Sequence, residues 1–245
     1  MNAMIFAAGL GTRLRPLTNN VPKALVGFNG QTLLQWNINR LKKAGFDRIV
    51  VNVHHFAPLV IKYLEDNKGF CAEIIISDES DHLLDTGGGL KNAQRYFKEG
   101  QHILIHNVDI ISNINLRALY RFHLKHQALA TLAVRNRKSS RVLMFDEHDL
   151  LRGWCNISTG EEKIPSPENQ PDVLRLLAFS GIQVIDYKLL NLINETGKFS
   201  MIDVYLRLSV SHKIMAYQHN SDFWTDVGKI EELKTAETAV SLYKF

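Results

Sequence analysis

The chain has 245 residues, of which 45% are hydrophobic and 22% are charged, and it carries a net charge of +4. This length is sufficient for one large domain with a substantial core. No segment approaches the roughly 18 continuous apolar residues of a membrane-spanning helix, and the opening residues meet glycine too early for a secretory signal. Lysine and arginine are scattered rather than clustered, so the composition does not indicate a nucleic-acid partner. A small anionic substrate fits the charge.

Cysteine and histidine give no metal-binding or disulfide pattern. Cys71 and Cys155 are far apart and neither belongs to a Cys-x-x-Cys pair, so we expect reduced thiols and a cytoplasmic protein without a membrane partner. The histidines are scattered, with no His-Glu-x-x-His and no zinc spacing. His123 and His126 share one face of a predicted helix and are expected on the surface.

Over the first half of the chain, short apolar runs alternate with amphipathic patterns. The apolar runs predict strands, and the patterns with a period near 3.6 residues predict helices. Strands are expected at residues 3–8, 48–53, 72–77 and 102–107, and helices at residues 31–45, 56–68, 88–97 and 114–126. Continuous apolar strands separated by helices indicate a parallel sheet that is covered by helices on both faces.

After about residue 128 the pattern becomes richer in strands. We expect strands at residues 128–135, 141–146, 150–154 and 176–185, followed by helices at 201–209 and 229–245. Residues 158–172 contain three prolines and are predicted to be a loop.

Residues 7–25, directly after the first predicted strand, hold two glycines, two arginines, two prolines and a lysine. No Gly-Lys-Ser/Thr follows, which excludes a Walker loop. A Rossmann fingerprint needs a third glycine, and Leu14 stands in its place. It also needs a helix to begin here, and Pro16 would lie inside that helix without an N–H to donate. Both residues therefore oppose a dinucleotide-binding loop. The glycines allow the backbone to approach phosphate oxygens, while Arg13 and Lys23 supply a planar fork of donors and a point charge. This segment predicts a phosphate-binding loop; a solvated surface loop is the alternative.

Two aspartates and a run of glycines are further candidates for a ligand-binding site. Asp109 follows the strand at 102–107, at the edge where parallel sheets bind ligands, and Asp226 lies in an Asp-Val-Gly turn. Triphosphate chemistry usually needs Mg²⁺, which prefers carboxylate ligands, so both aspartates are candidate metal ligands. For each aspartate taken alone, a structural role in a turn or helix cap is an equally good explanation. Gly87 to Gly89 open a predicted helix, where bare backbone can approach an anion or a planar ligand; a flexible loop is the alternative.

Residues 9–23 resemble the signature of the sugar-1-phosphate nucleotidyltransferases, G-x-G-T-R-L-x-P-x-T followed by P-K. The resemblance implies that this loop wraps a nucleoside triphosphate, with Arg13 beside the β- and γ-phosphates and Lys23 beside the α-phosphate. It implies three catalytic residues, Arg13, Lys23 and Asp109. The nucleotide-binding residues that it implies are Ala7, Ala8, Gly9, Gly11, Thr12, Arg13, Lys23, Gly87 and Asp109.

The aspartate segments carry the same resemblance. "NVD" at 107–109 is similar to the family's x-G-D element and "WTDVG" at 224–228 to its W-x-D-x-G element, which implies that Asp109 and Asp226 hold the cofactor Mg²⁺. Val108 and Lys229 depart from the usual glycine and threonine or serine. Asn107 leaves the chain without the Asp-x-Asp motif of related glycosyltransferases, which disfavours sugar transfer.

On the acceptor side, "GEEKIP" resembles the Glu-Lys-Pro stretch of the family, and "FSGIQVI" its F-x-G-I-x-V strand. The resemblance implies that Glu162, Lys163 and Gly181 bind the sugar phosphate. A Glu-Lys pair on a solvated turn is the alternative for the first two residues.

The resemblance spans nearly the whole chain. It implies an α/β fold with a Rossmann-like, mostly parallel sheet flanked by helices and an inserted β-rich acceptor region. The resemblance also implies that residues 1–245 form a single catalytic domain, in which 1–127 would bind the nucleotide and 128–245 the sugar phosphate. The partners are a nucleoside triphosphate and a sugar 1-phosphate, which react to a nucleotide-diphospho-sugar and pyrophosphate. A monomer is compatible with a free catalytic domain.

The base and the sugar are predicted from two short segments. Ala7-Ala8-Gly9 resembles the uridylyl- and thymidylyl-transferring members of the family. The L-x-T-G-G-G stretch ending at Gly89 resembles a subgroup that includes N-acetylmuramate 1-phosphate uridylyltransferases and some enzymes labelled mannose-1-phosphate guanylyltransferase. Together they favour uridylyl transfer to N-acetylmuramate 1-phosphate. Guanylyl transfer to mannose or heptose 1-phosphate is the alternative. A non-catalytic nucleotide-sugar sensor, favoured only by Val108 and Lys229, and an NAD-dependent oxidoreductase, opposed by Pro16, are two further hypotheses.

Overall fold

The computed structural model describes residues 1–169 and 171–242, so residues 243–245 of the last predicted helix lie outside the described part. The strands are β1 (Asn2–Phe6), β2 (Gly27–Phe28), β3 (Gln31–Thr32), β4 (Arg48–Val53), β5 (Glu73–Asp78), β6 (His102–Asn107), β7 (Ile110–Ser112), β8 (Ala130–Arg135), β9 (Arg141–Phe145), β10 (Leu151–Asn156), β11 (Glu161–Lys163), β12 (Arg175–Asp186), β13 (Ile214–Gln218) and β14 (Trp224–Asp226). The α-helices are α1 (Leu33–Lys43), α2 (Ala57–Asp66), α3 (Asp85–Ala93), α4 (Leu116–His126), α5 (Lys188–Asn191), α6 (Met201–Leu208) and α7 (Ile230–Leu242).

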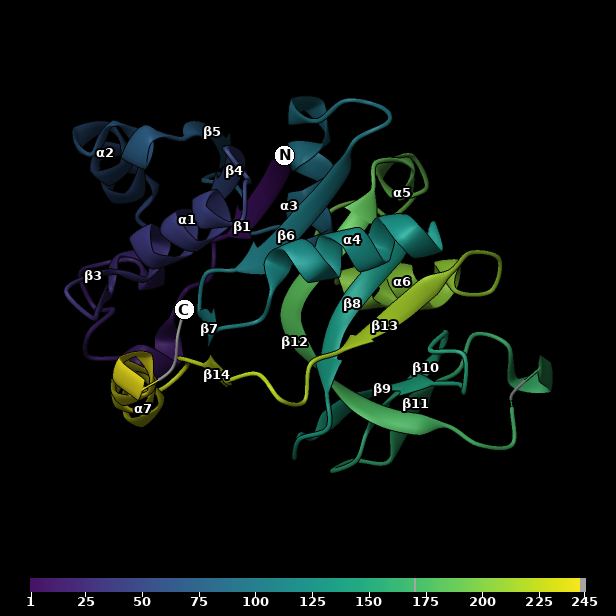
Figure 1. Ribbon diagram of the computed structural model, residues 1–245. Helices are drawn as coiled ribbons and strands as arrows, with labels where there is room; N and C mark the ends of the chain where they lie inside the picture. Colours follow the sequence, from purple (N-terminus) through teal and green to yellow (C-terminus); the bar gives the residue numbers. More distant parts are fainter. Residues whose placement is uncertain (170, 243–245) are drawn as a thin grey trace.

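Ten strands form one central sheet in the order β11-β10-β9-β12-β6-β1-β4-β5, with β8 beside β12 and β13 beside β8 (Figure 1). Strand β1 pairs in parallel with β4 and β6, and β4 pairs in parallel with β5. The predicted α/β fold with a Rossmann-like parallel core is therefore confirmed. The sheet becomes mixed at β12, which runs antiparallel to β6, β8 and β9.

The two faces of the sheet support two separate cores, because side chains alternate along each strand. On β1, Ala3 and Ile5 belong to one core, which receives apolar residues of α1, α2, α4 and α7. Met4 faces the other core, which is closed by α3, α5 and α6. Helices thus cover both faces, as the alternation of strands and helices predicts.

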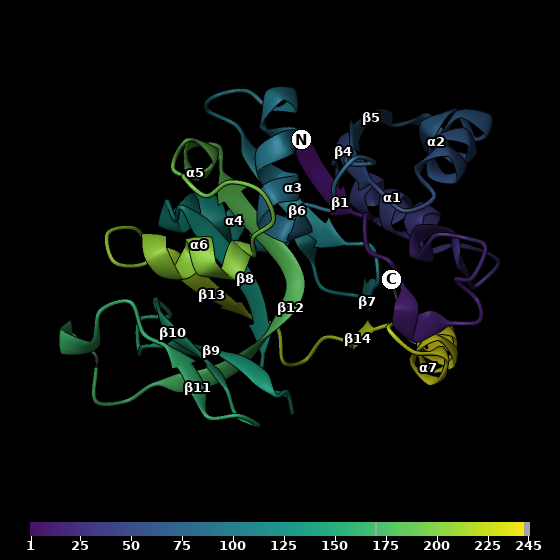
Figure 2. The same ribbon diagram turned by 180° about the vertical axis from the view of Figure 1, so that it is seen from behind.

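The inserted β-rich region is an arm built from β9, β10, β11 and the first half of β12, which projects below the main sheet (Figures 1 and 2). The prediction of a loop over residues 158–172 is wrong at Glu161–Lys163, which form β11 and pair with Trp154–Asn156. The Asn156 side chain accepts a hydrogen bond from the backbone N–H of Ser158, which stabilises the intervening turn. Residue 170 of the predicted loop lies outside the described residues.

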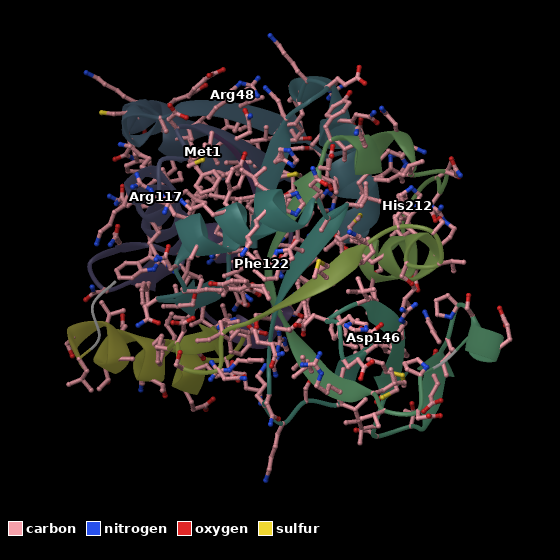
Figure 3. All side chains as sticks on the ribbon, turned by 45° about the vertical axis from the view of Figure 1, so that its right-hand side comes forward. Met1, Arg48, Arg117, Phe122, Asp146 and His212 are labelled. Carbon is pink, nitrogen blue, oxygen red and sulfur yellow. The ribbon has the colours of Figure 1, made fainter. Side chains whose placement is uncertain are left out.

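Asp146 anchors the β9–β10 hairpin of this arm and is labelled in Figure 3. Its carboxylate accepts hydrogen bonds from the backbone N–H groups of His148 and Leu150 and from the Arg152 side chain. The same carboxylate pairs with the Arg152 guanidinium at 2.8 Å. One buried acid thereby satisfies the donors of a tight turn.

The end of the chain returns to the elements of residues 1–127. Strand β14 pairs antiparallel with β7, and α7 then lies against the opening loop in both ribbon views. The backbone N–H of Asn29 donates to the Glu237 carboxylate of α7. No described helix has the length and apolar character that crossing a membrane requires.

The expectation that His123 is a surface residue is wrong, because its ring is fully buried between α4 and β8. His123 hydrogen-bonds with the Thr131 hydroxyl and with His102, and burial lowers its pKa to about 3. His219 is buried against the Ser180 hydroxyl at 2.7 Å, where burial lowers its pKa to about 4. Both rings are therefore neutral in the folded protein near neutral pH.

We expect the free energy of unfolding to fall as the pH is lowered from 6.5 towards 4. Between these values the unfolded chain binds protons on His123 and His219 that the folded chain does not bind. The loss should reach up to about 1.4 kcal/mol per pH unit for each histidine. Urea unfolding over a pH series measures it. His123→Gln should flatten the slope, whereas His212→Gln, at an exposed position, should not; an unchanged slope in His123→Gln would contradict the assignment.

Candidate active site

The opening loop folds back on itself at Gly11. This glycine has a φ of +64°, and a β-carbon there would lie 3.0 Å from Cβ of Lys23. The Thr18 hydroxyl donates a 2.8 Å hydrogen bond to the Gly11 carbonyl, which holds the two limbs of the loop together. Glycine adopts this left-handed backbone conformation without strain and leaves room for the close approach of Lys23. The fold of the loop thereby brings Lys23 against Gly11.

Lys23 forms a short ion pair with the first of the two predicted metal-binding aspartates. Its ammonium lies 2.5 Å from the Asp109 carboxylate, and the two side chains are only 9% and 21% exposed. Lys23 begins a short 3₁₀ turn after Pro22, while Asp109 follows the end of β6. An ion pair this far from solvent is screened little by salt.

The ladder between β7 and β14 brings Asp226 to the same place. Asp226 lies opposite Ile110, the neighbour of Asp109, and the backbone N–H of Val227 donates to the Asp109 carbonyl at 2.9 Å. The Arg13 guanidinium lies 3.6 Å from the Asp226 carboxylate. Four predicted site residues are therefore brought together from distant parts of the chain: Arg13, Lys23, Asp109 and Asp226.

The electrostatics of Asp226 suit a bound cation. Burial, followed by the negative charge of Asp109, raises the pKa of Asp226. Its Oδ1 atom is buried and has no hydrogen-bond partner in the described part of the chain. A divalent cation would satisfy this oxygen and relieve the repulsion between the two carboxylates, and Mg²⁺ commonly binds through one or two carboxylates with phosphates and waters as its other ligands. Within residues 1–169 and 171–242, no larger cluster of acids, histidines or cysteines offers a metal site.

Two adjoining hollows lie at the carboxyl edge of the parallel strands. The first has a volume of about 350 Å³ and is lined by Ala8 and Asn107 among others. The second has a volume of about 340 Å³ and is lined by residues 9–13 of the opening loop, including Thr12, and by Gly228. Gly9, Lys23 and Asp109 line both hollows. The cationic loop and the first acid therefore stand at the junction of the two spaces.

Two polar residues in the floor of the first hollow were missed by the sequence interpretation. The Asn52 side chain accepts a 2.7 Å hydrogen bond from the N–H of Ala7 and donates to the Glu79 carboxylate at 2.8 Å. Burial raises the pKa of Glu79, and its second oxygen has no hydrogen-bond partner. Asn52 and Glu79 stand at the carboxyl ends of β4 and β5, so a polar residue at the end of each apolar run was the available signal.

Gly87 lies in the first turn of α3, where the neighbouring Asp85 and Thr86 line the first hollow. Its N–H donates to the Phe199 carbonyl at 2.9 Å, and a β-carbon there would collide with the Phe199 ring. The three glycines are buried within α3 rather than placed in a flexible loop. Packing thus accounts for a glycine at position 87, and its contact with a nucleotide stays a prediction.

Gly87→Ala should lower the free energy of unfolding by about 1–3 kcal/mol, the usual cost of overpacking a well-packed site. The new methyl group would also lie 2.8 Å from the Phe199 carbonyl oxygen, so side-chain movement alone cannot relieve the clash. Chemical denaturation measures the change. Gly27→Ala is a matched control, because nothing lies within 4 Å of its β-carbon position. Equal stability of the two variants would contradict the role of packing at Gly87.

The predicted acceptor residues fall into two groups. Gly181 lies at the bend of β12 with a φ of +72°, and a β-carbon there would lie 2.9 Å from Ile110, so it stands beside the strand that follows Asp109. Glu162 and Lys163 lie on the exposed strand β11 of the arm. The Lys163 ammonium pairs with Asp203 at 2.7 Å. Neither residue lines the two hollows, and their contact with an acceptor stays a prediction.

The fold and this site define an α/β protein that can hold a phosphate-bearing ligand between a cationic loop and two carboxylates at the edge of a parallel sheet. Residues 2–241 match the family described as nucleotidyl transferase, and the chain belongs to this family.

Relatives and solved structures agree with this assignment. Over the full length of both proteins, the chain is 29% identical to the N-acetylmuramate alpha-1-phosphate uridylyltransferase of Neisseria meningitidis serogroup B. It is 48% identical to the protein of the same description from Caulobacter vibrioides, over 44% of this chain and 46% of that one. A crystal structure of a putative glucose-1-phosphate thymidylyltransferase from Bacillus anthracis superimposes with a TM-score of 0.80 at 16% identity, covering 100% of this chain and 97% of that one. This last similarity shows the fold.

Proposed function

We propose that this protein transfers a nucleotidyl group from a nucleoside triphosphate to a sugar 1-phosphate, with uridylyl transfer to N-acetylmuramate 1-phosphate as its reaction. The observation that carries the proposal is the convergence of Arg13, Lys23, Asp109 and Asp226 at the junction of two hollows. The full-length similarity to a protein described as the corresponding uridylyltransferase supports the choice of substrates. Nucleoside triphosphates are cytoplasmic metabolites, which supports a cytoplasmic location.

The two hollows suggest how the substrates divide the site. The first would take the base and ribose, against Ala8, Asn52 and Glu79. The second would take the phosphates, where the backbone of residues 9–12 and the Arg13 side chain supply donors. Lys23, which lines both, would then lie beside the α-phosphate, the point at which the two parts of a nucleotide meet.

The chemistry needs position and charge rather than a covalent intermediate. An oxygen of the sugar phosphate attacks the α-phosphorus in line and pyrophosphate leaves, so two anions must approach each other. Lys23 would stabilise the charge that develops at the α-phosphorus, and Arg13 would hold the departing pyrophosphate. Lys23 lies 2.5 Å from the Asp109 carboxylate and Arg13 lies 3.6 Å from the Asp226 carboxylate, so both positive charges already stand at the site before a ligand binds.

Asp109 and Asp226 would hold Mg²⁺, and the unpartnered oxygen of Asp226 is the structural feature that fits it. When bound, the ion would neutralise negative charge on the phosphates of both substrates. Lys23 would then be released from its pairing with Asp109, and its ammonium would be available to phosphate.

The identity of the nucleotide base is a further part of the proposal. The free oxygen of Glu79 would accept a hydrogen bond from a ring N–H, and both uracil and guanine carry such a donor. The similarity to uridylyltransferases favours uracil. Guanylyl transfer is the competing activity, so UTP and GTP must be compared directly.

Pyrophosphate release from a panel of substrates tests the proposal. UTP, GTP, CTP and dTTP are each mixed with Mg²⁺ and with N-acetylmuramate, N-acetylglucosamine, glucose or mannose 1-phosphate. We expect the highest kcat/KM for UTP with N-acetylmuramate 1-phosphate. A higher value for GTP with mannose 1-phosphate would overturn the choice of substrates but not the reaction class. Absence of pyrophosphate release from every pair would overturn the reaction and favour a nucleotide-sugar sensor.

Lys23→Ala and Asp109→Ala should each lower turnover by at least ~10²-fold, the order of loss when one preorganised electrostatic group is removed. Steady-state kcat at saturating concentrations of both substrates measures the effect. Lys62→Ala is the control, because Lys62 lies on α2 and forms an exposed pair with Asp66. Near-normal turnover in Lys23→Ala or Asp109→Ala would refute the role assigned to that residue.

A further inference from the structure

The acceptor side of the site contains a cation that the proposed mechanism does not use. Trp224 and Asp226 lie two residues apart on β14 and therefore project from the same face of that strand. The Arg137 guanidinium lies over the Trp224 ring, 4.4 Å from its centroid. The Trp224 indole N–H donates to the Ser180 carbonyl at 2.9 Å, directly before Gly181. Arg137 and Trp224 thus lie together beside the strand that carries Asp226.

Arg137 is fixed by weak contacts and an aromatic ring rather than by an acid. Its guanidinium donates to the carbonyls of Phe179 and Lys138 at 3.2 and 3.4 Å, both long hydrogen bonds. Its Nε atom is buried without a hydrogen-bond partner. Among the residues that the structure describes, no carboxylate forms an ion pair with it. A partly buried charge without a counter-ion is costly.

The surroundings of Arg137 show that its charge is incompletely compensated. Burial lowers the pKa of Arg137, and the negative charge of Asp226 opposes that shift. Arg135, on the same segment, adds a second positive charge nearby. An anion entering beside Asp226 from the acceptor half would meet a planar, stacked guanidinium whose two terminal nitrogens form long hydrogen bonds. Such a planar fork suits two oxygens of one carboxylate or phosphate.

We propose that Arg137 binds an anionic group of the acceptor and so helps to select and orient the sugar phosphate. This inference rests on the proposed function, since it assigns a residue to the acceptor of that reaction. Two groups on the acceptor share the required chemistry: the 1-phosphate, which every sugar 1-phosphate carries, and the lactyl carboxylate, which N-acetylmuramate carries and N-acetylglucosamine lacks.

Arg137→Gln, which removes the charge and keeps a polar side chain, tests the proposal. We expect the KM for the acceptor to rise at least about tenfold, the usual consequence of losing one charge-assisted hydrogen bond. The KM for UTP should stay within about twofold, a split that a general structural defect would not produce. Arg137→Lys should recover part of the loss, because it restores the charge but not the stacked planar fork. Lys138→Gln is the matched control, with one charge removed at an exposed neighbouring position.

Comparison of two acceptors identifies the group that Arg137 binds. An equal loss with N-acetylmuramate and N-acetylglucosamine 1-phosphate assigns Arg137 to the 1-phosphate. A loss with the muramate alone assigns it to the carboxylate. Unchanged KM values for both acceptors in Arg137→Gln would overturn the proposal.

Direct binding separates this inference from the reaction itself. Isothermal titration calorimetry of each sugar phosphate is carried out with wild-type protein and Arg137→Gln, in the presence of Mg²⁺ and a non-hydrolysable UTP analogue. Weaker binding to the variant supports the role of Arg137 even where the wild-type protein releases no pyrophosphate, an outcome that overturns only the proposed function. Equal binding to both proteins, or no binding of either acceptor to the wild type, would overturn the role of Arg137.

Discussion

The site depends on keeping two carboxylates side by side. Asp109 and Asp226 repel each other and are partly removed from water, which is why the pKa of Asp226 is raised. The ladder between β7 and β14 and the hydrogen bond from Val227 to the Asp109 carbonyl fix their backbones. Lys23 and Arg13 offset the repulsion. A bound triphosphate would also need these two cations. In the absence of a ligand, the positive charges of Lys23 and Arg13 therefore stabilise the two carboxylates, and in the proposed complex they would contact phosphate.

Residues from both halves of the chain are needed to build this site. The first half of the chain supplies the sheet edge, the cationic loop and Asp109, whereas the second half supplies Asp226, Trp224 and Gly181. Strand β12 joins them, because it pairs with β6 in the core and with β9 in the arm. Membership of the nucleotidyl transferase family also sets aside the dinucleotide-dependent oxidoreductase, which Leu14 and Pro16 already opposed.

The local sequence was sufficient to predict the parallel core of the sheet, the opening loop and Asp109. Apolar runs such as residues 48–53 and 102–107 coincide with β4 and β6, because a strand buried on both faces is apolar at every position. The opening loop is recognisable because glycines, prolines and cations at that spacing are typical of a segment that binds phosphate. Asp109 is recognisable because it follows a buried strand at the edge where parallel sheets bind ligands.

Only the tertiary structure decided which residues share a site. Strands β7 and β14 have three residues each, too few to show a period, and they pair across more than a hundred intervening residues. His123 was expected on the surface because a helical face does not reveal what packs on it. Asn52, Glu79 and Arg137 carry no motif, and their proximity to the site follows from which strand ends adjoin in the folded sheet. Sequence specifies local conformation and composition, whereas the distance between two charges depends on how the whole chain packs.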